Sequence, residues 1–352
     1  MIAEDLPRLG LGVIGAGSIA RQAHVPSYQA LPGIDLVAVA DSVPGRAEKF
    51  AAEFGFAHST TDFRELVRRD DVDLVSVCTP PAFHAEPTIA ALNGGKHVLC
   101  EKPMALDPAE AAGMVQAARG AGRVLAIDFQ MRFEWATQVS RQLVCSGELG
   151  APHYVRTWYL RRCGVPTWGA FTSKALNGGG ALIDIGVHAL DQALFVLGHP
   201  QPLSVWGSVA RPFGNQPGLT NTWGPWDHAA YDVDDFALAA IRFAGDLVLT
   251  LEASWALRQA ERSTRQVFVS ATAGGIELYP LRVFRDRQGR HSVETIEPPA
   301  ELPKAHALAV ADFVRAVRTG LPPTTPGEHG ALVARIVHAI YRSAEARAEI
   351  PL

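Results

Sequence analysis

The sequence has few cysteines, no dense cluster of one charge and no long uninterrupted apolar run. Its four cysteines, Cys78, Cys100, Cys145 and Cys163, are widely spaced and form no C-x-x-C pair, which argues against a disulfide framework or a zinc site. Every apolar stretch is broken by charge or glycine before it reaches the length of a membrane span. With a net charge of −4 and no Lys/Arg cluster, we expect neither a membrane nor a nucleic acid as partner.

The size and composition indicate a compact globular protein. The 352 residues suffice for two sizeable cores, with 48% hydrophobic and 19% charged residues. Cys78 and Cys100 lie in apolar runs and are expected to act as small hydrophobic residues. Residues 1–8 have an acidic start and no apolar centre, so we do not expect a signal peptide there, and the cytoplasm is the expected location.

Up to residue 128, apolar runs alternate with helical segments. The apolar runs cover residues 9–14, 34–40, 74–78, 96–100 and 124–127, and the helical segments cover residues 18–31, 44–54, 63–69, 85–93 and 108–119. This alternation predicts an α/β domain over residues 1–128, built on a doubly wound parallel sheet.

Beyond residue 128 the pattern changes to short segments in which polar and apolar residues alternate. These segments cover residues 153–160, 235–243, 247–255, 266–271 and 282–285, and several are joined by short turns. They predict an α+β domain over residues 129–352 with a large open antiparallel sheet and helices at 180–197, 304–318 and 328–347, the last of which can pack back on the first domain. Residues 211–231 are expected to form an irregular loop, either functional or a tolerated insertion.

A glycine-rich turn, Gly15-Ala16-Gly17-Ser18-Ile19-Ala20, joins the first apolar run to the first helical segment. Gly15 permits the tight turn, Gly17 lets the backbone approach a pyrophosphate, and the small Ala20 lets helix and strand pack closely. The phosphates would lie at the helix N-terminus, where unpaired N–H groups and the helix dipole favour negative charge. The pattern predicts a dinucleotide site, and the alternative is an ordinary strand–helix turn.

An acidic residue, Asp41, closes the second apolar run. Its carboxylate can accept hydrogen bonds from the ribose hydroxyls of the adenosine and repels a 2′-phosphate, which favours NAD over NADP. Arg46 lies close by in the sequence and can bind the extra phosphate, so NADP stays possible.

Glu101-Lys102-Pro103 follows an apolar run and therefore lies at the carboxyl end of a predicted parallel strand, where open α/β sheets bind ligands. Pro103 biases Lys102 toward an extended conformation that can direct its ammonium over the crevice. A lysine there can stabilise a developing alkoxide or transfer a proton. The alternative is a surface lysine after a strand.

Three polar residues, Asp184, His188 and Asp191, fall at i, i+4 and i+7 of an otherwise apolar helical segment. They share one face of the helix. An ordinary solvent-facing stripe would favour Glu, Lys, Arg and Gln, which are better helix formers. His188 could carry a substrate proton while Asp184 orients it or binds a neighbouring hydroxyl. The alternative is a capping or solvated stripe, and the spacing offers no third or fourth metal ligand.

These motifs together resemble the Gfo/Idh/MocA family of nicotinamide-dependent oxidoreductases over nearly the whole chain. The motifs that carry the resemblance are 15–20 with His24, 77–81 with His84, 95–103, 178–191 and 233–236. The resemblance implies an N-terminal Rossmann domain that binds NAD(P), and a C-terminal domain for substrate binding and oligomerisation.

The resemblance also implies roles for individual residues. Lys102 matches the catalytic lysine, and Asp184 and His188 match the active-site acid and histidine. The expected cofactor-binding residues are Gly15, Gly17, Ser18, Ile19, Asp41, Arg46, Thr79, Pro80, His84, Glu101, Lys102, Gln130 and Trp168. The chain departs from the family pattern at Gly169, where relatives carry an arginine, and at Pro81, where many carry asparagine. His24 is expected to be a helix-surface or packing residue rather than a ligand.

The implied reaction is reversible hydride transfer between a secondary or anomeric alcohol carbon of a sugar or cyclitol and the nicotinamide. Either Lys102 or His188 is the base, and the expected substrate-binding residues are Lys102, Tyr159, Arg161, Asp184 and His188. Arg162 is a further candidate; for it, as for Tyr159 and Arg161, the alternative is a solvated strand end. A homodimer or homotetramer is expected.

Two other functions stay open at this point. One is a lyase or glycoside-cleaving enzyme that uses tightly held NAD for transient oxidation. The other is a non-catalytic NAD-binding regulator, and the presence of Lys102, Asp184 and His188 together argues against it.

Overall fold

The computed structural model describes residues 7–352, except for the side chain of Arg287. Most of the N-terminal segment considered above, residues 1–6, lies outside the described residues. The chain forms two compact units. The first runs up to Gln130 and includes Pro303–Ala334, and the second comprises Met131–Leu302 and Arg335–Leu352.

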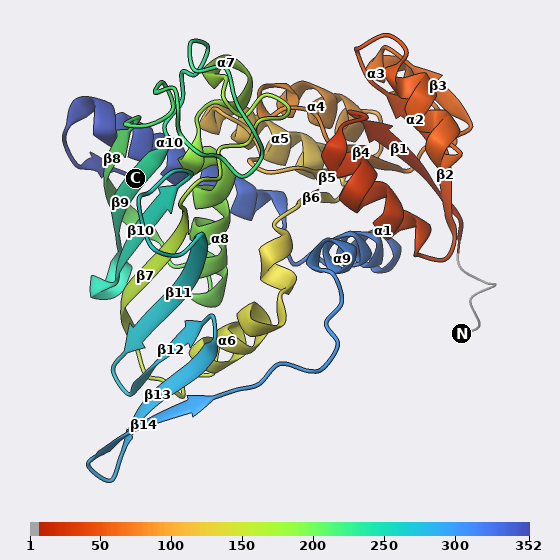
Figure 1. Cartoon of the computed structure of the whole chain (residues 1–352). Coiled ribbons are helices and arrows are strands. Elements are labelled where there is room, and N and C mark those ends of the chain that lie inside the picture. The colour runs from red at the N-terminus through yellow and green to blue at the C-terminus, as the bar shows by residue number, and fades with distance from the viewer. Residues whose placement is uncertain (1–6) are drawn as a thin grey trace. The chain divides into compact units, whose positions relative to one another are not determined.

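The first unit contains a six-stranded sheet in the order β3-β2-β1-β4-β5-β6, and all of its pairings are parallel (Figure 1). The strands are β1 (Leu9–Ile14), β2 (Ile34–Ala40), β3 (His58–Thr60), β4 (Leu74–Val77), β5 (His97–Cys100) and β6 (Leu125–Ile127). The doubly wound parallel sheet is thereby confirmed. The strand order reverses between β1 and β4, and open α/β sheets bind ligands at such a switch point.

Helices cover both faces of this sheet. The first helical segment, with η2 (Ala20–His24) and α1 (Val25–Gln29), shares a core with α2 (Arg46–Phe54) and α9 (Ala305–Thr319). The other helices are α3 (Phe63–Val67), α4 (Ala85–Asn93) and α5 (Pro108–Ala121), which pack on one another in sequence order. The predicted helix over 18–31 is not regular, because η2 is a π-helical turn. Such turns occur frequently at functional sites.

The second unit contains a nine-stranded sheet in the order β14-β13-β12-β11-β7-β10-β9-β8-β15. Its strands are β7 (Pro152–Arg161), β8 (Pro202–Ala210), β9 (Phe236–Phe243), β10 (Val248–Ser254), β11 (Ser263–Ala271), β12 (Gly274–Leu278), β13 (Leu281–Arg287), β14 (Arg290–Thr295) and β15 (Ile350–Pro351). The prediction of an antiparallel sheet is confirmed with one exception, because the central strands β7 and β10 are parallel. A long connection through the β8–β9 hairpin separates them in the sequence.

A buried helical segment packs on this sheet: a π-helical turn, η5 (Leu182–Gly186), continues directly into α8 (Val187–Val196). The Thr157 hydroxyl on β7 donates to the Ala189 carbonyl at 3.1 Å. The stretch Lys174–Val196 is long and apolar enough to cross a membrane by length and composition, but its apolar window is completely buried inside the protein. That burial is the pattern of a core helix. The unit also contains α6 (Trp135–Cys145) and α7 (Lys174–Asn177), and α10 (Gly327–Ala346) ends in it.

Candidate active site

In the first unit, the glycine-rich turn has the backbone that the sequence predicts. Gly15 has φ +98°, and a Cβ there would come within 2.7 Å of the Cys78 carbonyl group. At Gly17 a Cβ would meet no atom within 4 Å, so the backbone borders open space, as the approach of a pyrophosphate requires. The Arg21 amide donates to the Gly17 carbonyl at 3.2 Å, so Ser18 and Ile19 lie in the first helical turn, whose amides lack intrahelical acceptors.

Asp41 lies at the carboxyl end of β2 and is buried. Its Oδ2 accepts from the Ala16 amide at 2.9 Å and its Oδ1 from the Val43 amide at 2.9 Å. The half-exposed Arg46 guanidinium is 3.4 Å from Oδ1. Asp41 therefore holds the glycine-rich turn in place, and Arg46 neutralises part of the charge that would repel a 2′-phosphate.

The loops that follow β4 and β5 are joined by a buried imidazole. His84 Nδ1 lies 2.7 Å from the Pro103 carbonyl oxygen, and Nε2 lies 2.8 Å from the Thr79 carbonyl oxygen. Burial lowers the pKa of His84. Since both ring nitrogens face backbone carbonyls, His84 fixes the Thr79–Pro80 loop against the loop that carries Lys102. The Lys102 amide in turn donates to Glu101 Oε2 at 3.1 Å.

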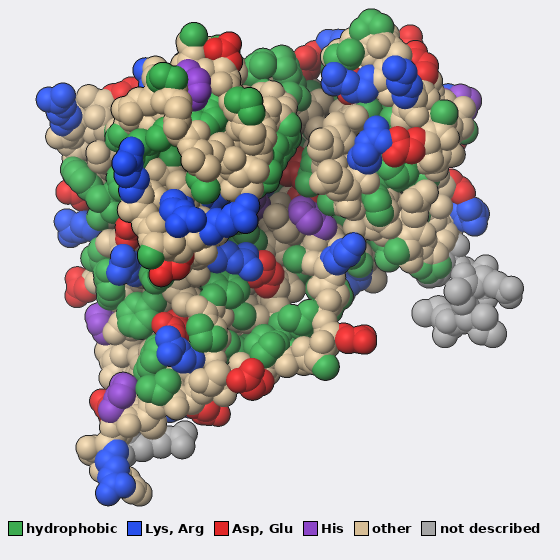
Figure 2. Space-filling model, in the orientation of Figure 1, with side chains coloured by type: hydrophobic (Ala, Val, Ile, Leu, Met, Phe, Trp, Pro, Cys, Tyr) green, Lys and Arg blue, Asp and Glu red, His purple; other side chains and the backbone are tan. Residues whose placement is uncertain are grey.

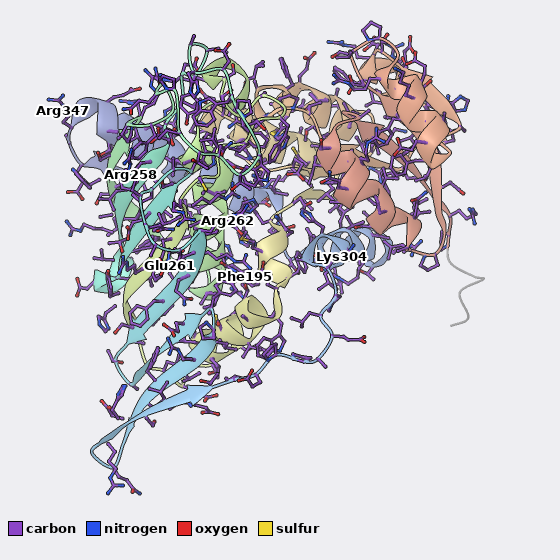
Figure 3. The ribbon with its side chains drawn as sticks, in the orientation of Figure 1. Phe195, Arg258, Glu261, Arg262, Lys304 and Arg347 are labelled. Atoms are coloured by element: carbon purple, nitrogen blue, oxygen red, sulfur yellow. The ribbon has the colours of Figure 1, made fainter. Side chains whose placement is uncertain are left out.

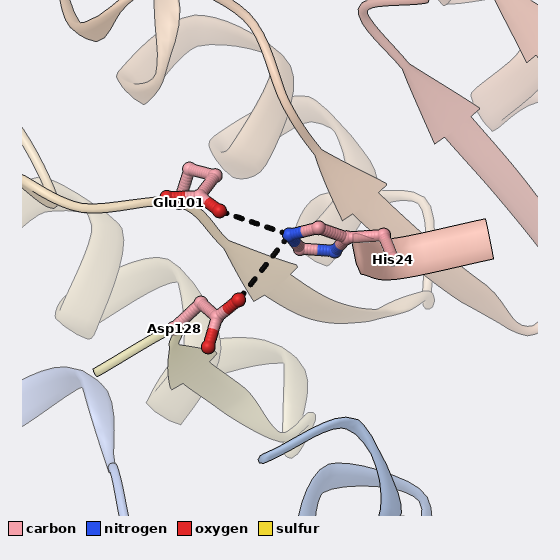
Figure 4. Close-up of side chains that lie close together, drawn as sticks. All are labelled: His24, Glu101 and Asp128. Carbon is pink, nitrogen blue, oxygen red and sulfur yellow. Dashed lines mark hydrogen bonds and ion pairs between the residues drawn. The ribbon is translucent and has the colours of Figure 1, made fainter. Parts of the chain in front are cut away.

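Glu101, the residue before Lys102, belongs to a buried cluster of acidic and imidazole groups (Figure 4). His24 Nε2 is 3.0 Å from Glu101 Oε1 and 3.3 Å from Asp128 Oδ2, and Asp128 Oδ2 is also 3.0 Å from His306 Nδ1. On its other side, His24 Nδ1 lies 3.1 Å from the Ser76 hydroxyl. His24 is therefore a completely buried packing residue with polar partners, and the possibility that it is a helix-surface residue is wrong.

The charges within this cluster compensate one another. Burial acts to lower the pKa of His24, but Cys78 and the Asp128 and Glu101 carboxylates together raise it well above its usual value. Burial acts to raise the pKa of Asp128, and the hydrogen bonds from His24 and His306 lower it overall. The ligand-type atoms of His24, Glu101 and Asp128 lie within 4.8 Å of one another. Hydrogen bonding between an imidazolium and two carboxylates accounts for that spacing.

In the second unit, Asp184 lies in the π-helical turn and His188 in the first turn of α8. Both are buried, so the alternative of a solvated stripe is wrong. Asp184 Oδ2 accepts from the Trp255 indole N–H at 2.9 Å and is 3.7 Å from Arg161 Nη1. The structure thus brings Arg161, predicted to bind substrate, next to the predicted active-site acid.

Asp191, the third residue of the predicted stripe, has a different role. It forms a bidentate ion pair with Arg132, at 2.9 Å from Nε and 2.6 Å from Nη2. Both side chains are almost completely buried, at 0% and 1% exposed. Asp191 therefore anchors α8 to the segment before α6.

The start of the π-helical turn is held by Asp234, for which the sequence predicts no individual role. Asp234 accepts from the Gly180 amide at 2.8 Å through Oδ1 and from the Leu182 amide at 3.0 Å through Oδ2. The Tyr341 hydroxyl donates to Oδ1 at 2.7 Å. A Cβ at Gly180 would lie 1.8 Å from the Asp234 carbonyl oxygen, which explains the glycine at this position. The 233–236 motif includes Asp234, but the Gly180 amide that it binds lies 54 residues away in the sequence.

The remaining predicted residues lie as follows. The Tyr159 hydroxyl is 3.4 Å from Arg161 Nη2, so these two candidates are neighbours. Arg162 is directed to the Ala260 carbonyl at 3.0 Å instead. Gln130 begins the 3₁₀ turn η4 (Gln130–Phe133), and Trp168 packs against other aromatic rings of the second unit.

The geometry in the first unit is that of a dinucleotide site, and comparison with known proteins agrees. Residues 9–129 match the family model described as "Oxidoreductase family, NAD-binding Rossmann fold", and residues 137–277 match the GFO/IDH/MocA C-terminal domain. The chain belongs to the Gfo/Idh/MocA family. It is an oxidoreductase, and its cofactor is NAD.

Relatives with assigned activities cover nearly the whole chain. A D-glucoside 3-dehydrogenase of Escherichia coli is 37% identical, with 98% of this chain and 97% of that protein covered. A 1,5-anhydro-D-fructose reductase of Ensifer adhaerens is 29% identical, with 91% of each covered. Among solved structures, a levoglucosan dehydrogenase in complex with NADH superposes with a TM-score of 0.85 at 26% identity, covering 98% of this chain and 99% of that one.

Proposed function

We propose that this protein is an NAD-dependent dehydrogenase that oxidises the C3 hydroxyl of a D-glucoside. The observation that carries the proposal is the 37% identity to the D-glucoside 3-dehydrogenase over 98% of the chain. Lys102, Asp184 and His188, the three residues proposed for the chemistry, are all present in the sequence. Oxidation removes one hydride from C3 and one proton from its oxygen and leaves a 3-keto glycoside.

The first unit supplies the cofactor site. The backbone at Gly17 leaves room for the pyrophosphate, and Asp41 lies where the ribose hydroxyls of the adenosine would donate to it. NAD, when bound, accepts the hydride. Lys102 is proposed to hydrogen-bond the reacting hydroxyl and to stabilise the oxygen as its proton leaves. Glu101 and His84 position Lys102 through the backbone contacts described above.

The second unit supplies the proposed acid–base and sugar-binding groups. His188 is the second candidate for the proton acceptor, and Asp184 is proposed to bind a neighbouring hydroxyl. The Trp255 indole N–H donates to Asp184 Oδ2, and the Arg161 guanidinium lies beside the same oxygen, so both help to orient the carboxyl group. Arg161 and the Tyr159 hydroxyl are proposed to donate to further ring hydroxyls.

The test is a panel of methyl glucosides, free aldoses and inositols incubated with NAD or with NADP, with reduced nicotinamide measured by absorbance. We expect NAD to be reduced with glucosides, and NMR of the product to show a carbonyl at C3. If no sugar reduces either cofactor, the dehydrogenase proposal fails. Consumption of a glycoside without net reduction would instead support cleavage through transient oxidation.

Two further properties go with this proposal. A homo-oligomer is proposed, because the sheet of the second unit carries partly exposed aromatic side chains such as Trp158 and Phe268. Light scattering of the purified protein would test this. A cytoplasmic location is proposed as well. The four cysteines are unpaired thiols, as expected in a reducing compartment.

A further inference from the structure

Two exposed tryptophans of the second unit lie together: Trp168, which the family resemblance relates to the cofactor, and Trp223, which has no role in the function proposed above. The Trp168 and Trp223 rings meet edge to face, with centroids 5.0 Å apart and an interplanar angle of 85°. Trp168 also meets Phe171 at 6.0 Å. The two indoles remain 44% and 40% exposed. We call Trp168, Phe171 and Trp223 the aromatic corner. Neighbouring exposed aromatic rings mark binding sites more often than scattered ones do.

The aromatic corner lies beside the proposed sugar-binding groups. The Arg161 guanidinium carbon is 5.3 Å from the centroid of the Trp223 ring and 5.0 Å from that of the Tyr159 ring. The same guanidinium reaches Asp184 at 3.7 Å. Its hydrogen bonds to the Gly164 carbonyl and the Tyr159 hydroxyl are long, at 3.4 Å each, so its five N–H donors retain capacity for a ligand. Arg161 therefore links Asp184 to Trp223.

The loop that carries Trp223 is held in one conformation by hydrogen bonds. The Asn221 side chain accepts from the Val165 amide at 3.0 Å and donates to the Val165 carbonyl at 2.8 Å. The Thr222 amide donates to the Cys163 carbonyl at 3.0 Å, and the Thr167 hydroxyl donates to the Trp223 carbonyl at 2.8 Å. The segments that present Trp168 and Trp223 are thus bound to each other. An ordered aromatic surface loses little conformational entropy when it binds a ligand.

The β10–β11 loop also contacts the segment that carries Trp223. Its Arg262, labelled in Figure 3, donates to the Thr222 hydroxyl at 3.2 Å. Its Arg258 lies 5.5 Å from the ring centroid of Phe213, at the start of the irregular loop. Figure 2 shows Lys and Arg side chains beside hydrophobic ones on the visible face of the second unit. Polar donors next to an apolar ring face are what a sugar needs.

The irregular loop, residues 211–231, contains one buried tryptophan that anchors it and one tryptophan that is exposed. Trp226 is only 9% exposed, and its indole N–H donates to the Gly214 carbonyl at 2.7 Å. Tyr231 is buried in the same core cluster. Three residues before Trp226, Trp223 is exposed with its backbone fixed. Because this arrangement orders the loop around one exposed indole, it favours the functional interpretation of residues 211–231 over a tolerated insertion.

We propose that the aromatic corner binds a second pyranose ring, the one joined through the anomeric oxygen to the ring that is oxidised. This inference rests on the proposed function. The C–H face of a pyranose is apolar and carries slight positive charge, which matches the negative face of an indole. The substrate class would therefore be glycosides with two sugar rings rather than free hexoses or methyl glycosides.

The test compares a two-ring substrate with a one-ring substrate. The ratio of kcat/KM for cellobiose to that for methyl β-D-glucoside is measured in the wild type and in Trp223→Ala. We expect the ratio to fall about tenfold, the size of one aromatic contact. Trp206→Ala is the matched control, because Trp206 is 43% exposed on β8. The adjacent Gly207 faces Ile340 of α10, so Trp206 is directed to the other side of the sheet.

Several outcomes would overturn the proposal. An unchanged ratio in Trp223→Ala would do so, as would an equal fall in the Trp206→Ala control. If Trp223→Ala does not fold, Trp223→Phe and Trp223→Leu replace it. In Trp223→Phe the ratio of the two kcat/KM values should stay close to that of the wild type, and in Trp223→Leu it should fall.

Failure of the proposed function can be told apart from failure of this inference. If neither substrate reduces NAD, binding of cellobiose to the wild type and to Trp223→Leu is measured by calorimetry. Binding that is weakened by the substitution would keep the aromatic corner as a sugar site without the proposed oxidation. Equal binding of cellobiose to the two proteins, or no binding to either, would contradict the assignment of the aromatic corner as a sugar site.

Discussion

The buried ion pair between Arg132 and Asp191 gives a stability prediction with a defined size. Asp191→Asn keeps the shape of the side chain and removes its charge, which leaves the completely buried Arg132 guanidinium without its carboxylate. Removing one partner of a buried ion pair costs about 3–5 kcal/mol, because the remaining charge stays desolvated. The Phe195 ring, with its centroid 5.2 Å from the guanidinium carbon, offsets only part of this cost.

The assay is urea unfolding followed by tryptophan fluorescence. All seven tryptophans lie between residues 131 and 302, so the signal reports the second unit alone. With a urea dependence of about 2–3 kcal/mol per molar, the midpoint should fall by roughly 1–2.5 M.

The double variant Arg132→Met/Asp191→Leu provides the control. It removes both charges and fills the space with apolar atoms, so we expect it to lose much less stability than Asp191→Asn. A loss below about 1 kcal/mol in Asp191→Asn would refute the view that a desolvated charge dominates. Lost turnover at unchanged stability would instead point to a role for Asp191 in the chemistry.

Three other predictions concern single side chains. Lys102→Met should keep its affinity for NAD, measured by calorimetry, and lose at least about 100-fold in kcat; normal turnover would remove Lys102 from the mechanism. Because the folded-state pKa of His24 is raised, its contribution to stability is complete below the unfolded value of about 6.5 and is lost as the pH rises through the folded value. The difference in Tm between wild type and His24→Gln should therefore be largest near pH 6 and shrink in alkaline buffer, and a constant difference would contradict this. Asp41→Asn keeps an acceptor for the Ala16 amide but removes the charge, so the ratio of kcat/KM with NADP to that with NAD should rise roughly tenfold, about 1.4 kcal/mol; an unchanged ratio would mean that Asp41 does not select the cofactor.

The sequence predicts best those elements whose signal is local. β1 and β2 have the bounds expected from their apolar runs, because strands buried on both faces are continuously hydrophobic. β3 was missed, since its three residues, His58–Thr60, are polar and largely exposed at the sheet edge. The parallel pairing of β7 with β10 was missed as well. Strand direction depends on the chain path between the two strands, and residue alternation carries no information on it.

The site residues also divide into those whose contacts are close in the sequence and those whose partners are distant. The glycines and Asp41 were identified because their contacts lie within about 25 residues of one another. The partners of Asp191 and His24 lie 59 and 77 residues away, so helical spacing alone could not reveal them. The π-helical turn adds to the difficulty, since it changes which side chains share a face. The i, i+4, i+7 pattern therefore grouped the three residues without revealing that Asp191 pairs with Arg132.

In each unit, an acidic side chain holds the backbone at or near a proposed site residue. The acid is Glu101 for Lys102 and Asp234 for Asp184. Glu101 Oε2 accepts from the Lys102 amide while Oε1 contacts His24. Asp234 accepts from the Leu182 amide, two residues before Asp184. Both acids contact the backbone rather than the side chain of Lys102 or Asp184, so each acts by fixing where that side chain starts. Displacing a reacting group by about 1 Å can cost 100-fold in rate. Glu101→Gln and Asp234→Asn should therefore lower kcat more than they change KM, although neither acid takes part in the proton transfer.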